Sequence, residues 1–285
     1  MRQFAESEGV AGPEGAATDA QIPAAARGDA GLPWPAAGVP QAATWLEAEV
    51  ATVAEQLALD EALLEEAHAG RLAEPVVRTW MAASPAVVVG SSSRIDEEVD
   101  RAACAAAGVP ILRRPSGGLT VVLGPGCLMW SVIAPLPAAV SPAIERLHAA
   151  LLDPLAAALE AAGRPVVRRG SSDLAVTAAD GERKVSGNAL RVRRGAVLYH
   201  GTLLDACDLA LISRLLRHPP REPGYRAGRE HGSFVANLGL GREAIEQAVR
   251  RAFAAAQSAG DWPAERVAAL VRERYASRAW TERLL

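Results

Sequence analysis

Apolar side chains recur at helical spacing between Val53 and Gly70, and acidic residues fall between them. The pattern predicts an amphipathic helix with its acids on the side opposite the apolar stripe. Gly70 follows the last apolar position, where a glycine commonly ends a helix. The apolar stripe comprises Leu57, Leu59, Ala62, Leu63 and Leu64.

The rest of the chain alternates between short apolar runs and longer amphipathic segments. The runs at 75–81, 85–92, 110–135, 173–178 and 184–204 predict strands, with a glycine-rich turn inside the third. Helices are expected at 96–108, 141–163, 241–257 and 263–275, the second capped by Ser141 with Pro142 in its first turn and Pro154 as a possible kink. This order predicts an α/β (α+β) domain in which helices pack on a mixed, antiparallel-rich sheet.

Composition and charge exclude several classes of function. The 285 residues carry a net charge of −3, and the pI is near 6.0, so no basic surface for nucleic acid is expected. Neither an apolar run long enough for a membrane span nor a secretory signal is found, which favours a cytoplasmic protein. The three cysteines form no CxxC or Cys/His pair, so neither a disulfide framework nor a zinc site is indicated.

Lys184 is the only lysine in a chain whose lysines and arginines together number 30. On a solvated surface the two residue types do comparable work, so arginine can replace lysine there at little cost. They differ where a compact charge must reach a reacting oxygen, because the guanidinium is broad and planar. The retention of one ammonium, beside Ser-Gly-Asn, marks Lys184 as a candidate catalytic residue.

Three short blocks combine charge, glycine and small hydroxyls: RRPSGG at 113–118, GSSDLAV with RKVSGNA at 170–189, and YHGTLL at 199–204. Glycines between strand and turn allow close approach of the backbone to a ligand and expose N–H groups to anionic oxygens. Together with Lys184, Arg113 and Arg114 would add positive charge to such a pocket.

In this order and spacing the three blocks resemble the lipoate-protein ligase A family, within the wider biotin and lipoate ligase and octanoyltransferase superfamily. The resemblance runs from about residue 42 to residue 256 and includes the LALDEALL helix at 57–64. It implies a catalytic role for Lys184. The residues that it implies for binding substrate or adenylate are Arg113, Arg114, Ser116, Gly117, Gly118, Ser186, Gly187, Asn188, Ala189, His200, Gly201 and Thr202.

The resemblance also implies a reaction. Lipoate or a related medium-chain acid attacks the α-phosphate of ATP, and the resulting acyl-adenylate is attacked by a lysine of an acceptor lipoyl domain. Such domains occur in the E2 subunits of 2-oxoacid dehydrogenases and in the glycine cleavage H protein. Asp173 stands where the family has an acid that helps to hold Mg²⁺ on the nucleotide, and carboxylate oxygen suits that ion. For His200, the sequence leaves open whether it lines the site or is a buried structural histidine.

Some positions depart from the family pattern and keep alternatives open. Leu119 replaces a usual third glycine and is expected to narrow the pocket. Acyl transfer from a carrier-protein thioester would need a cysteine nucleophile. Related transferases have this cysteine at one of two places, and at one of them this chain has Ser171 and Ser172 instead. Cys207 is a poor candidate for the nucleophile, because the neighbouring acids are expected to raise its pKa. A non-catalytic lipoyl-domain binder is a further alternative. Biotin ligation is disfavoured, because no GRGRxxR-type loop is found.

Three regions follow from these patterns. Residues 1–40, rich in Ala, Gly and Pro, are expected to be a disordered leader. Residues 42–257 are expected to form the ligase-like catalytic domain, and 258–285 a C-terminal helix and stub. Longer family members append a small C-terminal domain, so a small separate accessory protein is a possible partner. The glycine-broken stretch 220–238 is either a lid over the acyl-adenylate or a surface loop without such a role.

Overall fold

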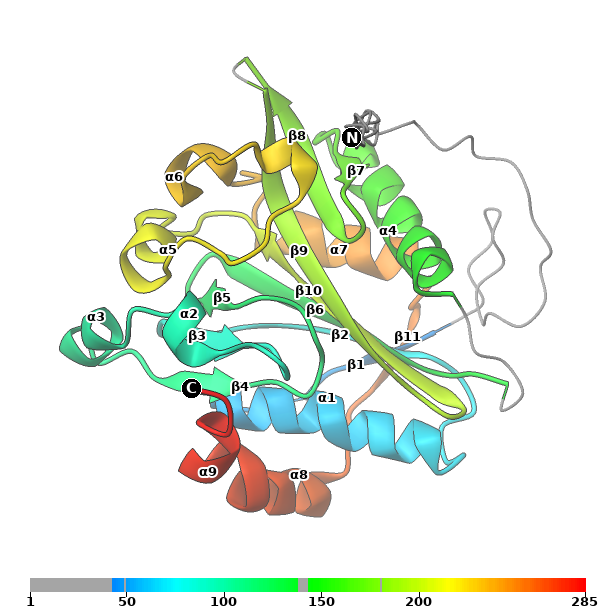
Figure 1. Ribbon diagram of the computed structural model, residues 1–285. Helices are drawn as coiled ribbons and strands as arrows, with labels where there is room; N and C mark the ends of the chain where they lie inside the picture. Colours follow the sequence, from blue (N-terminus) through cyan, green and yellow to red (C-terminus); the bar gives the residue numbers. More distant parts are fainter. Residues whose placement is uncertain (1–42, 49, 138–142, 180) are drawn as a thin grey trace, which may run out of the picture.

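A large mixed sheet forms the centre of the computed structural model, which describes residues 43–48, 50–137, 143–179 and 181–285 (Figure 1). The predicted leader at 1–40 and the predicted cap residues Ser141 and Pro142 lie outside the described residues. The strand order is β11-β1-β2-β6-β10-β9-β8-β7. The strands are β1 (Thr44–Leu46), β2 (Val76–Met81), β6 (Cys127–Pro135), β7 (Val167–Arg169), β8 (Asp173–Ala178), β9 (Gly181–Arg193), β10 (Ala196–Leu204) and β11 (Gln257–Ala259).

Most neighbours in this sheet are antiparallel; only β1 pairs in parallel, with β2 on one side and β11 on the other. A second, three-stranded sheet has the order β4-β3-β5 and consists of β3 (Ala86–Val89), β4 (Ile111–Arg113) and β5 (Val121–Leu123). The predicted α/β (α+β) class with an antiparallel-rich sheet is confirmed.

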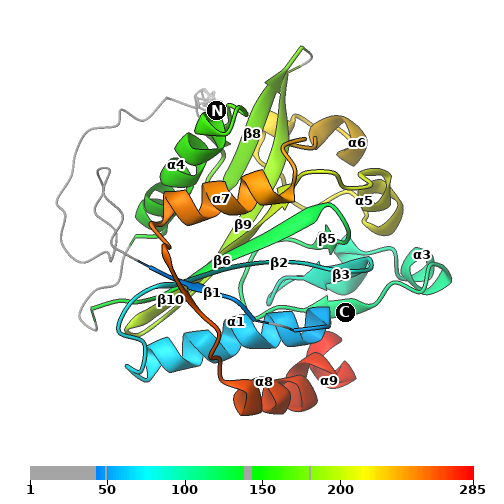
Figure 2. The same cartoon turned by 180° about the vertical axis from the view of Figure 1, so that it is seen from behind.

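Helices cover both faces of the large sheet (Figures 1 and 2). The long helix α4 (Ile144–Ala161) and α7 (Arg242–Ala252) pack on one face, and α1 (Val53–His68) packs on the other, with α8 (Ala264–Leu270) outside it against α1. Because strand side chains alternate between faces, Trp130 joins the core under α4 and α7, whereas its neighbour Met129 joins the core under α1. Among the described residues, no helix is long and apolar enough to cross a membrane.

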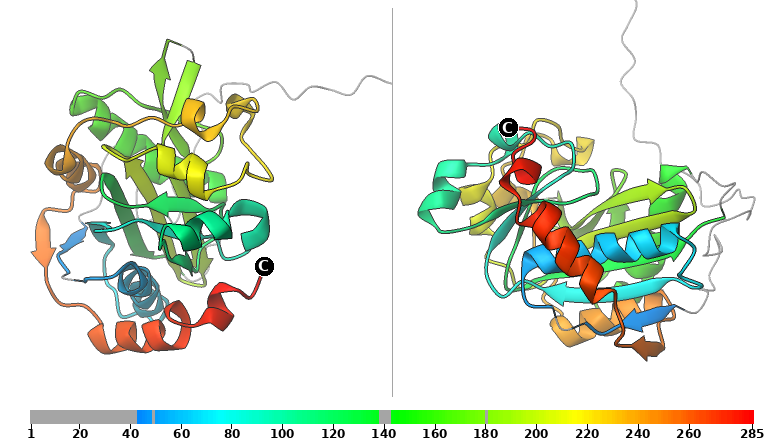
Figure 3. Two further views of the ribbon diagram at one scale, coloured as in Figure 1. Left: turned by 90° about the vertical axis from the view of Figure 1, so that its left-hand side faces the viewer. Right: turned by 90° about the horizontal axis from the view of Figure 1, so that it is seen from below.

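Helix α1 differs from the amphipathic prediction in one respect, because two of its acids are buried. Asp60 and Glu61 are only 1% and 3% exposed. Helix α8 and the short π-helix that follows it, Val271–Tyr275, cover the side of α1 that faces away from the sheet (Figure 3). There Glu61 forms an ion pair with Arg274 and accepts a hydrogen bond of 2.7 Å from the Tyr275 hydroxyl. From α8 the chain continues to α9 (Arg278–Thr281), beside the small sheet (Figure 3).

Two predicted helices are shorter than expected. The segment 96–108 is split into α2 (Ile95–Glu98) and α3 (Arg101–Ala106), because Val99 is extended and pairs as a β-bridge with Leu216. The helix predicted at 241–257 ends at Ala252, and residues 257–259 instead add strand β11 to the edge of the sheet. Two further short helices, α5 (Ala210–Leu215) and α6 (His231–Phe234), lie after β10.

Candidate active site

A cavity of about 620 Å³ opens between α1, the small sheet and the ends of β8, β9 and β10. That volume is within the range of small-molecule sites. Most residues that the sequence predicts for the site lie in its wall: Arg114, Gly117, Gly118, Asp173, Lys184, Gly187, Asn188, Ala189, His200, Gly201 and Thr202. Arg113, Ser116 and Ser186 do not line it and are fully buried.

Lys184 projects from β9 into the cavity wall, where its ammonium forms an ion pair of 2.8 Å with Oδ1 of Asp173 on β8. The Lys184 side chain is 29% exposed, so the charge remains within reach of a ligand. Its tip lies against the backbone of Gly187. A Cβ atom at position 187 would lie 2.7 Å from both Cε and Nζ of Lys184. The glycine of the KVSGNA block therefore makes room for the lysine of the same block.

Asp173 is held from two sides. Its Oδ1 forms the ion pair with the Lys184 ammonium, and its Oδ2 accepts a hydrogen bond of 3.0 Å from the hydroxyl of Tyr225. Burial and the neighbouring Asp173 carboxylate raise the pKa of Tyr225, so its hydroxyl remains a donor. Asp173 is buried and lines the cavity. No cluster of three or more His, Cys, Asp or Glu side chains suited to a metal occurs in the described part of the chain.

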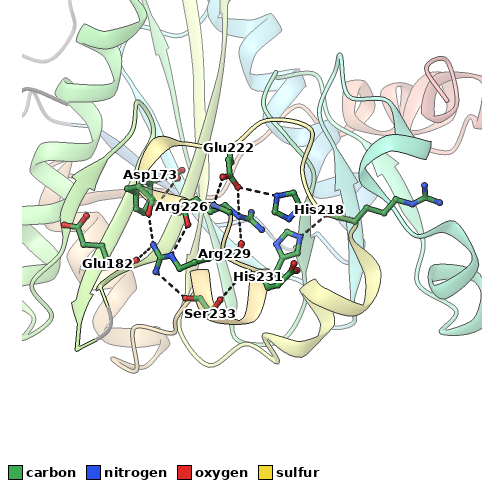
Figure 4. Close-up of polar contacts among 12 residues, drawn as sticks. Asp173, Glu182, His218, Glu222, Arg226, Arg229, His231 and Ser233 are labelled. Atoms are coloured by element: carbon green, nitrogen blue, oxygen red, sulfur yellow. Dashed lines mark hydrogen bonds and ion pairs between the residues drawn. The ribbon is translucent and has the colours of Figure 1, made fainter. Parts of the chain in front are cut away.

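The loop that carries Tyr225 packs over the ends of β8 and β9 (Figure 4). Its Arg229 guanidinium donates to the carbonyl of Glu182 at 2.9 Å and to that of Tyr225 at 2.7 Å. Within the loop, Arg226 forms an ion pair of 3.3 Å with Glu222. Residues 221–223 line the cavity. The segment predicted as a lid thus touches the site at its rim, and the lid function itself stays a prediction.

The glycine of the HGTLL block, Gly201, makes room for the side chain of Asn188. The Asn188 amide donates to the carbonyl of Ser172 at 2.8 Å, which ties the Ser171–Ser172 turn to β9. A Cβ atom at Gly201, on the neighbouring strand, would lie 1.7 Å from Oδ1 of Asn188. Only a glycine at position 201 leaves room for this amide.

Arg114 holds the glycine-rich turn from inside. Its buried guanidinium donates to Oγ of Ser116 at 3.0 Å and to the carbonyls of Gly117 and Leu119 at 2.6 and 2.9 Å. Burial lowers the pKa of Arg114 to about 10, so the group remains charged at neutral pH. Two of the turn's carbonyls, those of Gly117 and Leu119, face Arg114, whereas the amides of Gly117 and Gly118 have no acceptor among the described residues. These two amides are available to a ligand in the cavity.

Arg113 differs from the prediction, because its charge does not reach the cavity. The side chain is fully buried and donates to four backbone carbonyls, those of Gly90, Ser93, Thr281 and Leu284, at 2.7 to 2.9 Å. Two of these acceptors belong to the C-terminal segment. Arg113 therefore fastens that segment to the strand that precedes the glycine-rich turn.

His200 combines both roles that the sequence leaves open. It lines the cavity, yet it is only 3% exposed and both ring nitrogens have partners. Nε2 lies 2.6 Å from Oγ of Ser116, and Nδ1 lies 3.0 Å from Oδ2 of Asp60. Asp60 also pairs with Arg78 at 2.6 Å. Asp60 and Arg78 were not among the residues predicted for the site. The signal in the sequence was Arg78, the only charged residue of the otherwise largely apolar strand β2, whereas Asp60 is one of several acids in α1.

An apolar wall completes the cavity. Leu57 of α1, Val88, Leu123 and Met129 line it and belong to one contiguous core cluster. Leu119, which replaces the family's third glycine, lies in the same wall. The cavity thus offers apolar surface together with an ammonium and free backbone amides, which suits a ligand with an apolar chain and an anionic group.

The cysteines lie away from this site. None of Cys104, Cys127 and Cys207 lines the cavity. The net pKa of Cys207 is lowered, mainly by a hydrogen bond from the Cys127 thiol, although burial and, as expected, the Asp205 charge raise it. Cys127 is buried, and its pKa is raised by the Cys207 contact and by burial.

Comparisons with known proteins show which family the chain is similar to. A model of the "Lipoyl protein ligase A/B catalytic domain" family matches residues 52–257. The Aeropyrum pernix protein named "Putative lipoate-protein ligase A" is 37% identical over 160 residues, a match that covers 56% of this chain and 56% of that protein's length.

Solved structures share the fold. The bipartite lipoate protein ligase of Thermoplasma acidophilum, studied with its E2 lipoyl domain, has a TM-score of 0.70 and 23% identity, covering 87% of this chain and 98% of that one. A lipoate-protein ligase A bound with ATP has a TM-score of 0.71 and 22% identity, covering 86% of this chain and all of that one. A Thermoplasma acidophilum structure with bound lipoic acid has a TM-score of 0.69 and 21% identity, covering 85% and 100%.

Proposed function

Because the chain belongs to the family of lipoyl protein ligase A/B catalytic domains, we propose that it attaches lipoate, or a related medium-chain acyl group, to a lysine of a lipoyl domain. The acceptors would be the lipoyl domains of 2-oxoacid dehydrogenase E2 subunits or the glycine cleavage H protein. The acyl group is activated by ATP as an acyl-adenylate.

The observation that carries the proposal is the position of Lys184. The only ammonium side chain of the sequence lies in the wall of the cavity, against Gly187 and beside Asp173. The same cavity has an apolar wall for an acyl chain and two amides without acceptors for anionic oxygens. These are the groups that an acyl-adenylate requires.

In the first step, a carboxylate oxygen of lipoate attacks the α-phosphorus of ATP and pyrophosphate leaves. Negative charge grows on the phosphoryl oxygens. Lys184 and the amides of Gly117 and Gly118 are held in place before the reaction, so they stabilise this charge without reorganising. The apolar wall around Leu57 and Met129 holds the acyl chain and excludes water from it.

Asp173 would hold Mg²⁺ together with phosphate oxygens of ATP. Magnesium sites at nucleotides need only one or two protein carboxylates, so the single carboxylate fits the ion in chemistry. Both of its oxygens have partners here, and the contact with Tyr225 is the one to be exchanged, because Lys184 is needed by the reaction. The ion would neutralise phosphate charge.

In the second step, the acceptor lysine attacks the carbonyl carbon of the mixed anhydride, and AMP leaves. The carbonyl oxygen gains negative charge, which the Lys184 ammonium is placed to stabilise. His200 does not serve as the base that deprotonates the acceptor amine in this arrangement, because both of its ring nitrogens are engaged in hydrogen bonds.

Transfer from a carrier-protein thioester is the less favoured alternative. It needs a thiolate at the site, and no cysteine lines the cavity. Two assays of the purified chain decide between the routes. Release of pyrophosphate from ATP in the presence of lipoate, followed by the mass increase of a lipoyl domain, supports the proposal. Transfer from an acyl carrier protein without ATP, with no pyrophosphate released, would favour the thioester route.

A further inference from the structure

The carboxylate of Asp60 on α1 meets three polar side chains of the sheet in a buried part of the protein, where Gln56 of α1 also accepts from Arg78. Arg78, Ser131 and His200 are directly opposite one another on the adjacent strands β2, β6 and β10. All three are buried, and each contacts the carboxylate of Asp60 on α1. Arg78 and Ser131 donate to Oδ1 at 2.6 and 2.9 Å, and Nδ1 of His200 lies 3.0 Å from Oδ2.

The partners determine where the proton of His200 sits. Burial raises the pKa of Asp60, but Arg78, His200 and Ser131 together lower it below its usual value. The carboxylate is therefore ionised and only accepts, so Nδ1 of His200 must carry a proton. On the other side of the ring, Arg114 donates to Oγ of Ser116, which leaves the Ser116 hydroxyl proton free to point at Nε2. A neutral ring protonated on Nδ1 satisfies every group.

We propose that Asp60 is a positioning residue of the active site: it fixes the tautomer of His200, which accepts the Ser116 hydroxyl at Nε2 and so sets the conformation of the glycine-rich turn that binds the acyl-adenylate. This proposal rests on the proposed function and extends it to a residue that does not line the cavity. The Ser116 hydroxyl is hydrogen-bonded to both His200 and Arg114, and the amides of Gly117 and Gly118 follow directly in the chain.

The substitution Asp60→Asn tests this series of contacts from Asp60 through His200 to Ser116, here called the relay, with little change in the shape of the side chain. The Arg78 guanidinium has no acceptor atom, so the single oxygen of asparagine must face Arg78 and, beside it, Ser131. The amide NH₂ then faces Nδ1 of His200 and donates to it, which forces the ring proton to Nε2. Nε2 would then donate to Ser116, and the serine hydroxyl would have to turn away. Ser131→Ala, which removes another contact of the same carboxylate, is the matched control.

The first measurement is ¹⁵N NMR of histidine-labelled protein, with the His200 signals assigned by their loss in His200→Gln. The wild-type chain should show His200 with a proton on Nδ1 and none on Nε2, and Asp60→Asn the reverse. This readout needs no substrate, so it stands even if the proposed function fails. A wild-type ring protonated on Nε2 alone, or on both nitrogens at neutral pH, overturns the proposal without any variant.

The second measurement is the rate of adenylate formation in a double-mutant cycle. Asp60→Asn should lower kcat/KM on the order of 100-fold, the effect expected of a displacement of about 1 Å at a reacting site. In the Ser116→Ala background the same substitution should cost less than about threefold, because the path runs through Ser116. Ser131→Ala should leave activity within about threefold of wild type. Equal losses in both backgrounds would show a merely structural role and overturn the proposal.

If Asp60→Asn does not fold, the double-mutant cycle uses Asp60→Glu and Ser116→Ala. The tautomer of His200 in the wild-type protein still decides whether the proposal holds. Absence of pyrophosphate release by the wild-type chain, with the expected tautomers, would contradict the proposed function and not the relay. Normal ligation with the opposite tautomer would contradict only the relay.

Discussion

Replacing Gly187 by alanine should remove activity while sparing the fold. A Cβ atom at this position would lie 2.7 Å from both Cε and Nζ of Lys184, whereas ordinary contacts begin near 3.4 Å. The backbone dihedral φ at position 187 is not in the left-handed region, so alanine causes no backbone strain there. The clash is with the tip of a flexible side chain, which can move. The free energy of unfolding should therefore change by less than about 1 kcal/mol.

The displaced ammonium carries the functional cost. To reach an ordinary contact at 3.4 Å instead of 2.7 Å, Nζ must move by at least roughly 0.7 Å, away from the position where it meets the developing charge. A misplacement that approaches about 1 Å can lower the rate about 100-fold, so we expect a loss of this order in both half-reactions. Gly260→Ala, a remote position where a Cβ atom meets nothing within 4 Å, is the control. Wild-type rates for Gly187→Ala, in a protein of unchanged stability, would refute the assigned role of Lys184.

Three further predictions follow from other groups. Arg113→Met should lower the free energy of unfolding in urea by at least about 3 kcal/mol, because four buried carbonyls lose their donor; unchanged stability would contradict the structural role. The triple variant Cys104→Ala, Cys127→Ala, Cys207→Ala should keep ATP-driven transfer within about threefold, since no cysteine lines the cavity, whereas loss of transfer with intact circular dichroism would favour the thioester route. The pKa of Asp60 is lower in the folded protein than its unfolded value near 3.8, so the ionised carboxylate stabilises the fold above that pH, and this stabilisation is lost as the pH falls through the folded pKa. The urea midpoint should therefore fall more steeply below pH 3.8 in the wild type than in Asp60→Asn. Equal slopes would contradict a lowered pKa of Asp60.

Local patterns predicted most of the elements, and most residues that the motif blocks proposed for the site lie around one cavity. The strands around Lys184 and His200 and the glycine-rich turn follow from β-branched runs and turn residues, which act over a few neighbours in the chain. The blocks that carry Lys184 and His200 converge on one cavity because β8, β9 and β10 pair in sequence, whereas the glycine-rich turn lies between β4 and β5 of the small sheet. Convergence of this kind is predictable from adjacent antiparallel strands.

What the sequence pattern missed depends on partners far away in the chain. Asp60 and Glu61 look like solvent-facing acids of an amphipathic helix. Their burial is explained by partners in other elements, among them Arg78, Arg274 and Tyr275. The strand β11 exists because β1 offers it an edge, and local periodicity carries no signal of that. Arg113 resembles Arg114 in sequence, but alternation along the backbone sends the two guanidinium groups to different carbonyls.

The most direct test of the account is the transfer of lipoate from synthetic lipoyl-adenylate to a purified lipoyl domain, comparing wild type with Lys184→Arg and Lys184→Ala. The shape of the ammonium, not only its charge, is needed beside Gly187, so both variants should fold normally and lose on the order of 100-fold or more in rate. The mass of the lipoyl domain over time gives the rate, and circular dichroism confirms the fold. Transfer by Lys184→Arg at near wild-type rate would contradict the central claim.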